Sequence, residues 1–221
     1  MIKIYLLDFN GAEADINYLS ALPSYIENTK NKKLKRERLF SYSLLKYAYA
    51  ECFDSQMPEI LRDENGRPFF ASGEIDFNLS HDSEMAALVI SDEDKCGIDI
   101  QLVTDSVSED LILKTKKRYE KNRVFEATRG SDKIDGKIII LTVSDNGKIC
   151  SAFDHDHAIT DEADSDFFSC WTALEAIAKA DGRGLSYFEK IALSNVLALG
   201  HARIADKRGN MYALCACKYK K

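Results

Sequence analysis

The sequence has no apolar run long enough to cross a bilayer. Its hydrophobic stretches, such as 137–143, are interrupted by charge or fall far short of the roughly 20 apolar residues that a spanning helix needs. We also expect no secretion signal, because Lys3 and Asp8 bracket a short run that is typical of a strand rather than of a charged-then-apolar leader. We therefore exclude transmembrane helices and expect a cytoplasmic protein.

No two cysteines have the Cys-x-x-Cys spacing of redox and metal motifs. The six cysteines are scattered along the chain, at Cys52, Cys96, Cys150, Cys170, Cys215 and Cys217. Without an export signal to an oxidising compartment, we predict reduced thiols. Cys215 and Cys217 are two apart in an expected strand, so they point to one face and favour small apolar packing over metal ligation.

An excess of positive charge is also lacking. Lys and Arg number 30 against 36 Asp and Glu, which gives a net charge of -6. This balance argues against a generic nucleic-acid binder, which neutralises many phosphates with a basic surface. Any contact with a polyanion must therefore be local. With 221 residues, of which 45% are hydrophobic, the chain can bury the core of one large or two small domains.

The first half predicts a helix beside a small antiparallel sheet. Residues 1–8 predict a strand, and 23–53 have leucines among charged residues at a spacing typical of a helix. A turn is expected at 63–68, where Asn65-Gly66 precedes Arg67-Pro68. Further strands are expected at 75–80, 85–90 and 96–100.

The second half predicts a similar order of elements. A solvated helix is expected at 108–125, and a hairpin at 137–153 turns at Asn146-Gly147. A helix at 165–180 would end at Gly182, and two strands at 201–205 and 211–217 close the chain. No repeat of residue identity is visible. We predict an α+β fold with an N-terminal half, 1–104, and a C-terminal half, 105–221.

Trp171, Glu175 and Lys179 are spaced four apart, so on a helix they form one line with a carboxylate between an aromatic ring and a cation. Taken alone, this line is better explained by an ordinary Glu–Lys pair beside a core tryptophan. Asp99 lies between Ile98 and Ile100 in an expected strand and faces away from both. Alone, it too is better explained as a residue on a solvent-facing strand surface.

The two patterns occur together, and this changes their interpretation. Gly97-Ile98-Asp99 upstream of the segment from Trp171 to Leu185 resembles the two signatures of the 4'-phosphopantetheinyl transferases, most closely the surfactin-synthetase-activating type. Two further segments resemble the family in the expected order, Gly66-Arg67-Pro68 and Phe77-Asn78-Leu79-Ser80-His81. The resemblance implies a pseudo-twofold pair of α+β halves with the active site between them.

The resemblance also implies a reaction. Such enzymes transfer 4'-phosphopantetheine from coenzyme A to a serine of an apo acyl or peptidyl carrier protein and release adenosine 3',5'-bisphosphate. They use Mg²⁺, with Mn²⁺ as an alternative, and the two-half type is monomeric. The carrier would serve fatty-acid, polyketide or nonribosomal-peptide synthesis. A membrane or nucleic-acid partner is not expected.

The predicted metal ligands are Asp99, Glu175 and Gln101. Mg²⁺ prefers one or two carboxylates with phosphate oxygens and water, so two acids form a sufficient protein contribution. Gln101 stands where the family usually has an acid, and it can ligate only through its carbonyl oxygen. Asp99, Glu175 and Lys179 form the predicted catalytic set, with Glu175, directly or through a metal-bound water, as the base for the carrier serine.

The predicted coenzyme A contacts come from several segments. Lys179 would meet a phosphate as a point charge, and Ser80 and His81 resemble the family's phosphate contacts. Arg67 is predicted to contact the nucleotide. In the basic run 30–38, the resemblance places the 3'-phosphate near Lys33 and Arg36, although such a run is usually a solvated face.

The distance between the two acids departs from the family. Asp99 and Glu175 are separated by 175 - 99 = 76 positions, longer than expected, and the extra length predicts a hairpin and loop insertion at about 127–164. The polar stretch from Asp154 to Glu162 within it fits no standard zinc spacing and is better explained as a loop.

Two readings of function remain open beside the transferase. Gln101 makes a catalytically impaired module that binds coenzyme A or a carrier protein conceivable, whereas the presence of both acids counts against it. A nucleic-acid binder acting through the basic run at 30–38 is disfavoured by the net charge.

A second basic cluster fits either a docking patch for an acidic carrier or a solvated face, and it comprises Lys114, Lys116, Lys117, Arg118, Lys121 and Arg123.

Overall fold

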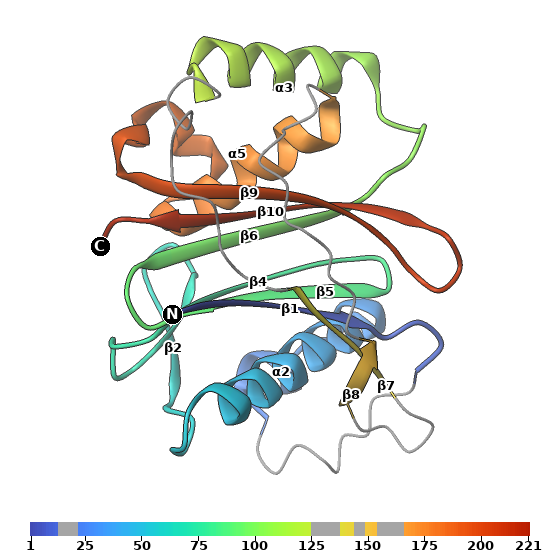
Figure 1. Ribbon diagram of the computed structural model, residues 1–221, viewed down its shortest axis with the longest axis vertical. Coiled ribbons are helices and arrows are strands. Elements are labelled where there is room, and N and C mark those ends of the chain that lie inside the picture. Colours follow the sequence, from blue (N-terminus) through green and yellow to red (C-terminus); the bar gives the residue numbers. More distant parts are fainter. Residues whose placement is uncertain (13–21, 125–137, 144–148, 154–165) are drawn as a thin grey trace.

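The computed structural model describes residues 1–12, 22–124, 138–143, 149–153 and 166–221. Two β-sheets lie face to face, and helices cover the outer face of each (Figure 1). The space between the sheets is filled by aliphatic side chains from both, including Leu6, Val89, Ile98 and Leu214. The described chain is therefore an α+β protein in four layers, helix, sheet, sheet and helix.

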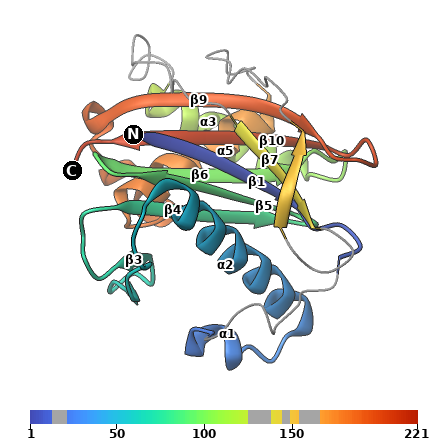
Figure 2. The ribbon, with the colours of Figure 1, turned by 60° about the horizontal axis from the view of Figure 1, so that its bottom comes forward.

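The first sheet has five strands in the order β4-β5-β1-β7-β8. Their bounds are β1 Ile2–Asp8, β4 Asp76–Asp82, β5 Met85–Ser91, β7 Ile138–Val143 and β8 Ile149–Phe153. β1 pairs antiparallel with β5 and parallel with β7. Helix α2, Lys32–Cys52, packs across the outer face of this sheet, after the short helix α1, Ser24–Glu27 (Figure 2). β5 is buried along its whole length because both faces of the sheet are covered.

The second sheet has three strands in the order β6-β10-β9. Their bounds are β6 Lys95–Leu102, β9 Val196–Ala205 and β10 Met211–Tyr219. Helix α5, Phe167–Asp181, packs on its outer face, and α3, Glu109–Lys121, lies over α5 (Figure 1). Two short 3-10 turns, η2 Leu185–Lys190 and η3 Leu193–Asn195, lead from α5 into β9.

Local sequence explains where α5 begins and ends. The Asp166 side chain accepts a hydrogen bond from the Ser169 backbone N–H and caps the first turn. Gly182 adopts a positive φ of 95° and ends the helix, as predicted. The helix lies so close to β6 that a Cβ atom on Gly97 would come within 2.0 Å of the Ala176 carbonyl oxygen. A glycine at 97 therefore permits the close approach of α5 to β6.

β4 and β6 run side by side without backbone pairing. Alternate side chains of β4 accept hydrogen bonds from backbone N–H groups of β6 instead, at 2.7 to 3.4 Å. We call these four acceptors the polar seam, and they are Asp76, Asn78, Ser80 and Asp82, bonded in turn to the N–H groups of Cys96, Ile98, Ile100 and Leu102. The seam gives hydrogen-bond acceptors to the backbone N–H groups along the edge of β6, and it joins the two sheets.

A small hairpin lies beside the two main sheets. β2, Ile60–Arg62, pairs with β3, Pro68–Phe70, around a turn in which the Asp63 carboxylate accepts from the backbone N–H groups of Asn65 and Arg67. Gly66 has a φ of 83°, which glycine adopts readily. The turn predicted at 63–68 is confirmed, and it places Arg67 immediately before β3.

Most predicted helices and strands are confirmed, but some strands pair with other partners than expected. The helix expected over 23–53 is interrupted between α1 and α2. The strand expected at 96–100 does not join the first-half sheet, because β6 pairs with β10 instead. The hairpin of β7 and β8 extends the first sheet through β1, whereas most of the 127–164 insertion lies outside the described residues. The division into two related halves stays a prediction.

The cysteines follow the sequence-based expectation where the structure describes them. Cys52, Cys96, Cys170, Cys215 and Cys217 are free thiols. Cys215 and Cys217 are fully buried in the apolar core beneath α5. Burial raises the pKa of the Cys215 thiol well above its usual value, which favours the neutral form. The predicted small apolar role is thus confirmed for this pair.

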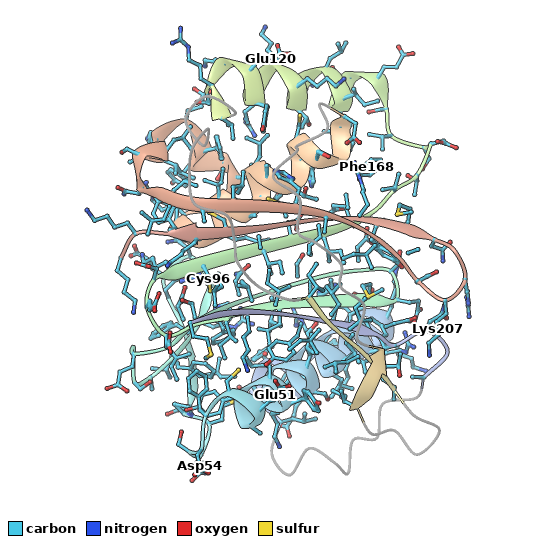
Figure 3. All side chains as sticks on the ribbon, viewed as in Figure 1. Glu51, Asp54, Cys96, Glu120, Phe168 and Lys207 are labelled. Atoms are coloured by element: carbon cyan, nitrogen blue, oxygen red, sulfur yellow. The ribbon has the colours of Figure 1, made fainter. Side chains whose placement is uncertain are left out.

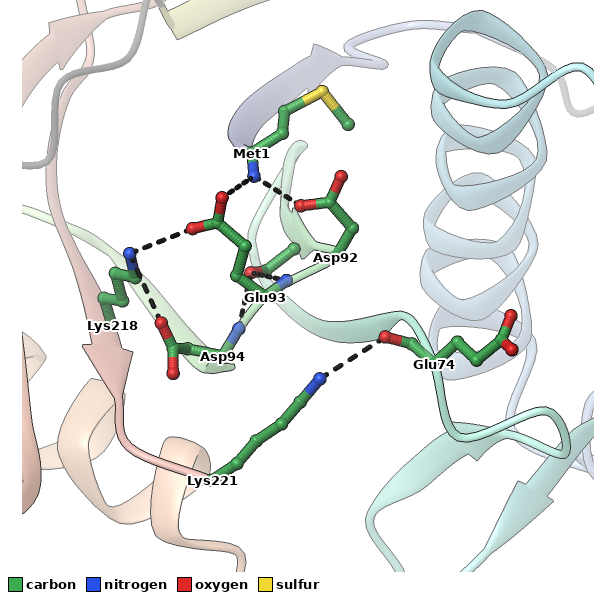
Figure 4. Close-up of polar contacts among 8 residues, drawn as sticks. Met1, Glu74, Asp92, Glu93, Asp94, Lys218 and Lys221 are labelled. Carbon is green, nitrogen blue, oxygen red and sulfur yellow. Dashed lines mark hydrogen bonds and ion pairs between the residues drawn. The ribbon is translucent and has the colours of Figure 1, made fainter.

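A charged network joins β1, the β5–β6 turn and β10. The amino group of Met1 contacts Asp92 and lies 2.9 Å from Glu93, and Lys218 lies 3.2 Å from Glu93 and 3.3 Å from Asp94 (Figure 4). These side chains are all at least partly exposed, so each ion pair contributes little to stability. Within the ranges that the structure describes, no helix is long and apolar enough to span a membrane.

Candidate active site

Three side chains from three elements meet at the middle of the seam. Asp99 of β6 is 2% exposed, and its Oδ1 lies 2.6 Å from the Lys179 ammonium of α5. The hydroxyl of Ser80 on β4 donates to the same oxygen at 2.9 Å and accepts from Lys179 at 3.0 Å. Lys179 also donates to the Ile98 carbonyl oxygen at 3.2 Å. The buried carboxylate is therefore both charge-paired and hydrogen-bonded.

Gln101 completes the contacts of Asp99. Its amide nitrogen donates to the second carboxylate oxygen, Oδ2, at 3.1 Å. Asp99 thus accepts three side-chain hydrogen bonds, from Lys179, Ser80 and Gln101. A carboxylate has about four acceptor positions, so roughly one remains for a further ligand.

Glu175 lies one turn before Lys179 on α5 and is half-buried. Burial raises the pKa of Glu175 above its ordinary value, and the charge of Asp99 acts in the same direction. Lys179 and Arg118 oppose that shift of the Glu175 pKa through their positive charges. The structure therefore brings Glu175 into the electrostatic field of the Asp99–Lys179 pair.

His81 and Lys33 meet at one carboxylate. The His81 Nδ1 atom lies 3.7 Å from Oε2 of Glu37, and the Lys33 ammonium lies 3.8 Å from Oε1 of Glu37. Burial lowers the pKa of His81 and the charge of Lys179 lowers it further, while Glu37 opposes the shift. Lys33 itself is 79% exposed. The start of α2 thus lies next to the end of β4, close to the Asp99 site.

Arg36, a predicted 3'-phosphate contact, lies among groups that accept hydrogen bonds. Its guanidinium lies 2.7 Å from Glu84 and donates to the carbonyl oxygens of Phe9 and Ala12 at 2.8 and 2.9 Å. It also lies over the ring of Phe9, with 4.9 Å between its central carbon and the ring centre. Arg36 therefore holds the end of β1 and the β4–β5 turn onto α2.

Arg67 borders a small basic cavity. It is 12% exposed and donates to Asp76 at 2.7 Å and to the Cys96 carbonyl oxygen at 3.0 Å. Its Nε atom is buried with no hydrogen-bond partner among the described residues. A cavity of about 260 Å³ is lined by Arg67, Lys179 and Arg183, together with Asn78 and the loop at Gly182. We call it the basic cavity.

A second cavity lies at the other end of the same elements. It has a volume of about 610 Å³ and is bordered by Asp82, Gln101, Phe168 and Trp171. We call it the aromatic cavity. β4, β6 and α5 therefore carry, in order along their length, the basic cavity, the Asp99 centre and the aromatic cavity. An elongated ligand with a charged end fits this order.

Sequence reasoning missed two residues of the basic cavity, Asn78 and Arg183. Both belong to segments that resemble the family, so their place within those segments was the sequence feature that could have identified them. Asn78 alternates with Ser80 on β4, and this places both side chains on one face. Arg183 follows Gly182, the glycine at which α5 ends. Period-two spacing and the helix end could therefore have indicated them.

Comparisons with known proteins support the family in part. No protein-family model matches the chain. A segment of 50 residues is 42% identical to the 4'-phosphopantetheinyl transferase AcpT of Salmonella typhi and 44% identical to the AcpT proteins of Escherichia coli O157:H7 and of strain K12. The matches cover 22% of this chain and 26% of each relative, about a quarter of its length. They support a relationship to 4'-phosphopantetheinyl transferases without distinguishing the types within that family.

Proposed function

We propose that the protein transfers the 4'-phosphopantetheine arm of coenzyme A to a serine of an apo carrier protein and releases adenosine 3',5'-bisphosphate. The observation that carries this proposal is the meeting of Asp99, Ser80 and Lys179, next to Glu175, between a basic and an aromatic cavity. The partial likeness to AcpT transferases supports the same reaction.

The basic cavity suits the nucleotide end of coenzyme A. Arg67 and Arg183 offer guanidinium groups, which pair well with phosphate, and Lys179 extends the positive charge toward the diphosphate. Lys33 and His81 form a second set of candidate phosphate contacts near Glu37. We leave Arg36 out of this set because its guanidinium already contacts Glu84 and two backbone carbonyls.

The side chains around Asp99 fit Mg²⁺ by their chemistry. Asp99, Glu175 and Gln101 offer hard oxygen donors, and Asp99 retains roughly one acceptor position beside its three hydrogen bonds. Among the residues that the structure describes, no group of three or more His, Cys, Asp or Glu side chains could hold a metal ion. A bound ion would take its remaining ligands from phosphate oxygens and water. When bound, Mg²⁺ would neutralise charge on the diphosphate oxygens.

In the proposed reaction, the carrier serine oxygen attacks the phosphorus that bears the pantetheine arm. The serine proton passes to Glu175, directly or through a water, so Glu175 is the proposed general base. The bond from that phosphorus to the bridging oxygen breaks, and the electron pair leaves with adenosine 3',5'-bisphosphate. Lys179 donates to a phosphate oxygen and stabilises the charge that develops there.

Incubation with coenzyme A, Mg²⁺ and several apo carrier proteins tests the proposal. Intact-mass measurement should show one phosphopantetheine added to at least one carrier, and Glu175→Gln should slow the addition strongly. The control is a carrier whose acceptor serine is replaced by alanine, which should keep its mass. No mass change on any carrier, under conditions where a known transferase modifies all of them, would contradict the proposed reaction.

The alternative is a module that binds coenzyme A or a carrier without catalysis. Gln101 favours it, because an amide brings no negative charge to a divalent cation. Wild-type protein that binds coenzyme A in a calorimeter, yet leaves every carrier unmodified, would establish this alternative.

A further inference from the structure

Glu37 brings a buried carboxylate to the point where α2 meets the end of β4. It is 9% exposed, and the ammonium of Lys33 and the Nδ1 atom of His81 lie 3.8 and 3.7 Å from its two carboxylate oxygens. Both distances are too long for a hydrogen bond, and no described residue donates one to this carboxylate. We call the three side chains the Glu37 group. Its carboxylate retains acceptor positions that a ligand can fill.

The Glu37 group borders the candidate active site. β4 is an edge strand of the five-stranded sheet, and Ser80 and His81 are consecutive on it. Successive side chains of a strand face opposite sides, so Ser80 contacts Lys179 at 3.0 Å while His81 turns to α2. The charge of Lys179 also acts on the pKa of His81. In coenzyme A the ribose follows the diphosphate directly, so a diphosphate at Lys179 can bring the ribose 3' position to this group.

The basic side chains near Glu37 offer little free positive charge to a phosphate. Lys33 faces Glu37 itself. Arg36, for which the sequence predicts a contact with the 3'-phosphate, lies 2.7 Å from Glu84. Burial lowers the pKa of His81, so its ring is neutral near neutral pH. A phosphate monoester carries a charge of about -1.5 to -2 under these conditions, and it would meet a carboxylate here.

The wider charges around His81 also balance. Two acids and two cations act on its pKa, and they are Glu37, Asp82, Lys179 and Arg38. Lys179 is paired with Asp99 at 2.6 Å, and the Arg38 guanidinium donates to the Thr29 hydroxyl at 2.8 Å. Among the described residues, the Glu37 group therefore has no surplus of positive charge.

We propose that Glu37 selects a free ribose 3'-hydroxyl over a 3'-phosphate, so the protein uses 3'-dephospho-coenzyme A at least as well as coenzyme A. The reaction in this inference rests on the proposed function, whereas the selectivity rests on the Glu37 group. The carboxylate accepts a hydrogen bond from the hydroxyl and repels a phosphate at the same place. Dinucleotide-binding proteins use the same chemistry, in which an acid binds a ribose hydroxyl and an arginine accommodates the corresponding phosphate.

The transfer itself is unchanged with this donor. The carrier serine oxygen bonds to the phosphorus that bears the pantetheine arm, and the serine proton passes to Glu175. The bond from that phosphorus to the bridging oxygen breaks, and its electron pair leaves with adenosine 5'-phosphate. The nucleotide product, adenosine 5'-phosphate or adenosine 3',5'-bisphosphate, therefore reports which donor was used.

Competition between the two donors tests the selectivity. One apo carrier is incubated with Mg²⁺ and equal concentrations of coenzyme A and 3'-dephospho-coenzyme A, and the two nucleotide products are separated by chromatography. We expect the wild type to release at least as much adenosine 5'-phosphate as adenosine 3',5'-bisphosphate. Glu37→Gln removes the negative charge at nearly constant shape, so it should raise the ratio of bisphosphate to 5'-phosphate about tenfold.

Glu120→Gln makes the same charge change far from the Glu37 group and serves as the control. Figure 3 labels Glu120 on α3 and Glu51 on α2, on opposite sides of the two sheets. The control should keep the wild-type product ratio. An effect on the carrier cancels in this ratio, because both donors compete for one enzyme and one carrier. The wild-type ratio needs no variant, so the test holds even if Glu37→Gln fails to fold.

Calorimetry without a carrier measures the same preference in the absence of transfer. The wild type should bind 3'-dephospho-coenzyme A at least as tightly as coenzyme A. Glu37→Gln should bind coenzyme A about tenfold more tightly than the wild type does. Its Kd for 3'-dephospho-coenzyme A should stay within about twofold of the wild-type value, because an amide oxygen still accepts from a hydroxyl.

The outcomes separate the selectivity from the reaction. Transfer with a wild-type preference for coenzyme A, or with equal product ratios for Glu37→Gln and the control, would overturn the role of Glu37 and leave the transferase standing. Donor binding with the expected preference, but without transfer to any carrier, would support the role of Glu37 and overturn the reaction. If the wild type binds neither donor, both proposals fall.

Discussion

Gly97 on β6 faces the backbone of Ala176 on α5 so closely that a Cβ atom would lie 2.0 Å from the Ala176 carbonyl oxygen and 2.6 Å from the Ala180 nitrogen. The obstructing atoms belong to the helix backbone, so they cannot move aside without a shift of α5. Since α5 carries Glu175 and Lys179 and β6 carries Asp99, this contact sets the distance across the candidate site.

We predict that Gly97→Ala destabilises the protein by about 3 kcal/mol or more. The added methyl group forces α5 away from β6, and this also separates Lys179 from Asp99. Thermal and urea unfolding should measure the loss. Adding Ala180→Gly removes only a Cβ atom at 3.0 Å and leaves the backbone clash, so it should not restore stability. Unchanged unfolding of Gly97→Ala would contradict the close approach.

The effect of replacing Lys179 on stability follows from the burial of Asp99, its ion-pair partner. Asp99 is 2% exposed, so Lys179→Met leaves a buried carboxylate without its cation, which should cost about 3 kcal/mol of unfolding free energy. Asp99→Asn/Lys179→Met removes both charges and should recover much of that stability without recovering activity. Urea unfolding of the two single variants and the double variant measures the coupling. Additive losses would show that the pair does not act as a unit.

Much of this site could be predicted from local patterns. The spacing of Glu175 and Lys179 predicted that both lie on one face of a helix. The alternation of apolar and polar residues around Asp99 predicted which face of the strand its side chain occupies. Both predictions are possible because these periodicities are properties of the backbone. Gly182 marked the end of α5 for the same local reason.

The pairing of β6 with β10, by contrast, could not be predicted. Alternation tells which face a side chain occupies, but the partner of a strand depends on contacts distant in sequence. The polar seam joins β4 to β6 through side chains, and the same alternation of polar residues on β4 also fits a solvent-exposed strand face. The environment of Arg36 likewise depends on Glu84, Phe9 and Ala12, which only the fold brings to it.

Gln101→Glu is predicted to tighten metal binding and to destabilise the protein in the absence of metal. The new carboxylate adds a charged ligand, which should lower the Kd for Mg²⁺ about tenfold. Without metal, it replaces the hydrogen bond to Asp99 with repulsion between two acids. Calorimetry with Mg²⁺ and thermal unfolding with and without the ion measure both effects. Gln56→Glu, the same charge change at an exposed residue after α2, is the control. Equal metal affinities of wild type and Gln101→Glu would contradict the assignment.

The final prediction concerns the protonation of His81. Burial lowers the pKa of His81 below its ordinary value of 6.5, with a further contribution from the charge of Lys179. The unfolded chain therefore takes up a proton at a higher pH than the folded protein does. The stability associated with neutral His81 is present above pH 6.5 and is lost as the pH falls from there toward the folded pKa.

Heteronuclear NMR of the histidine rings should show the His81 midpoint below that of a histidine in an unfolded peptide. His81→Asn, which identifies its signal, should flatten the fall in stability over this pH range. His201→Asn leaves the His81 titration in place and serves as the comparison. A His81 midpoint at or above the peptide value would contradict burial as the dominant influence, and would mean that the carboxylate of Glu37 outweighs it.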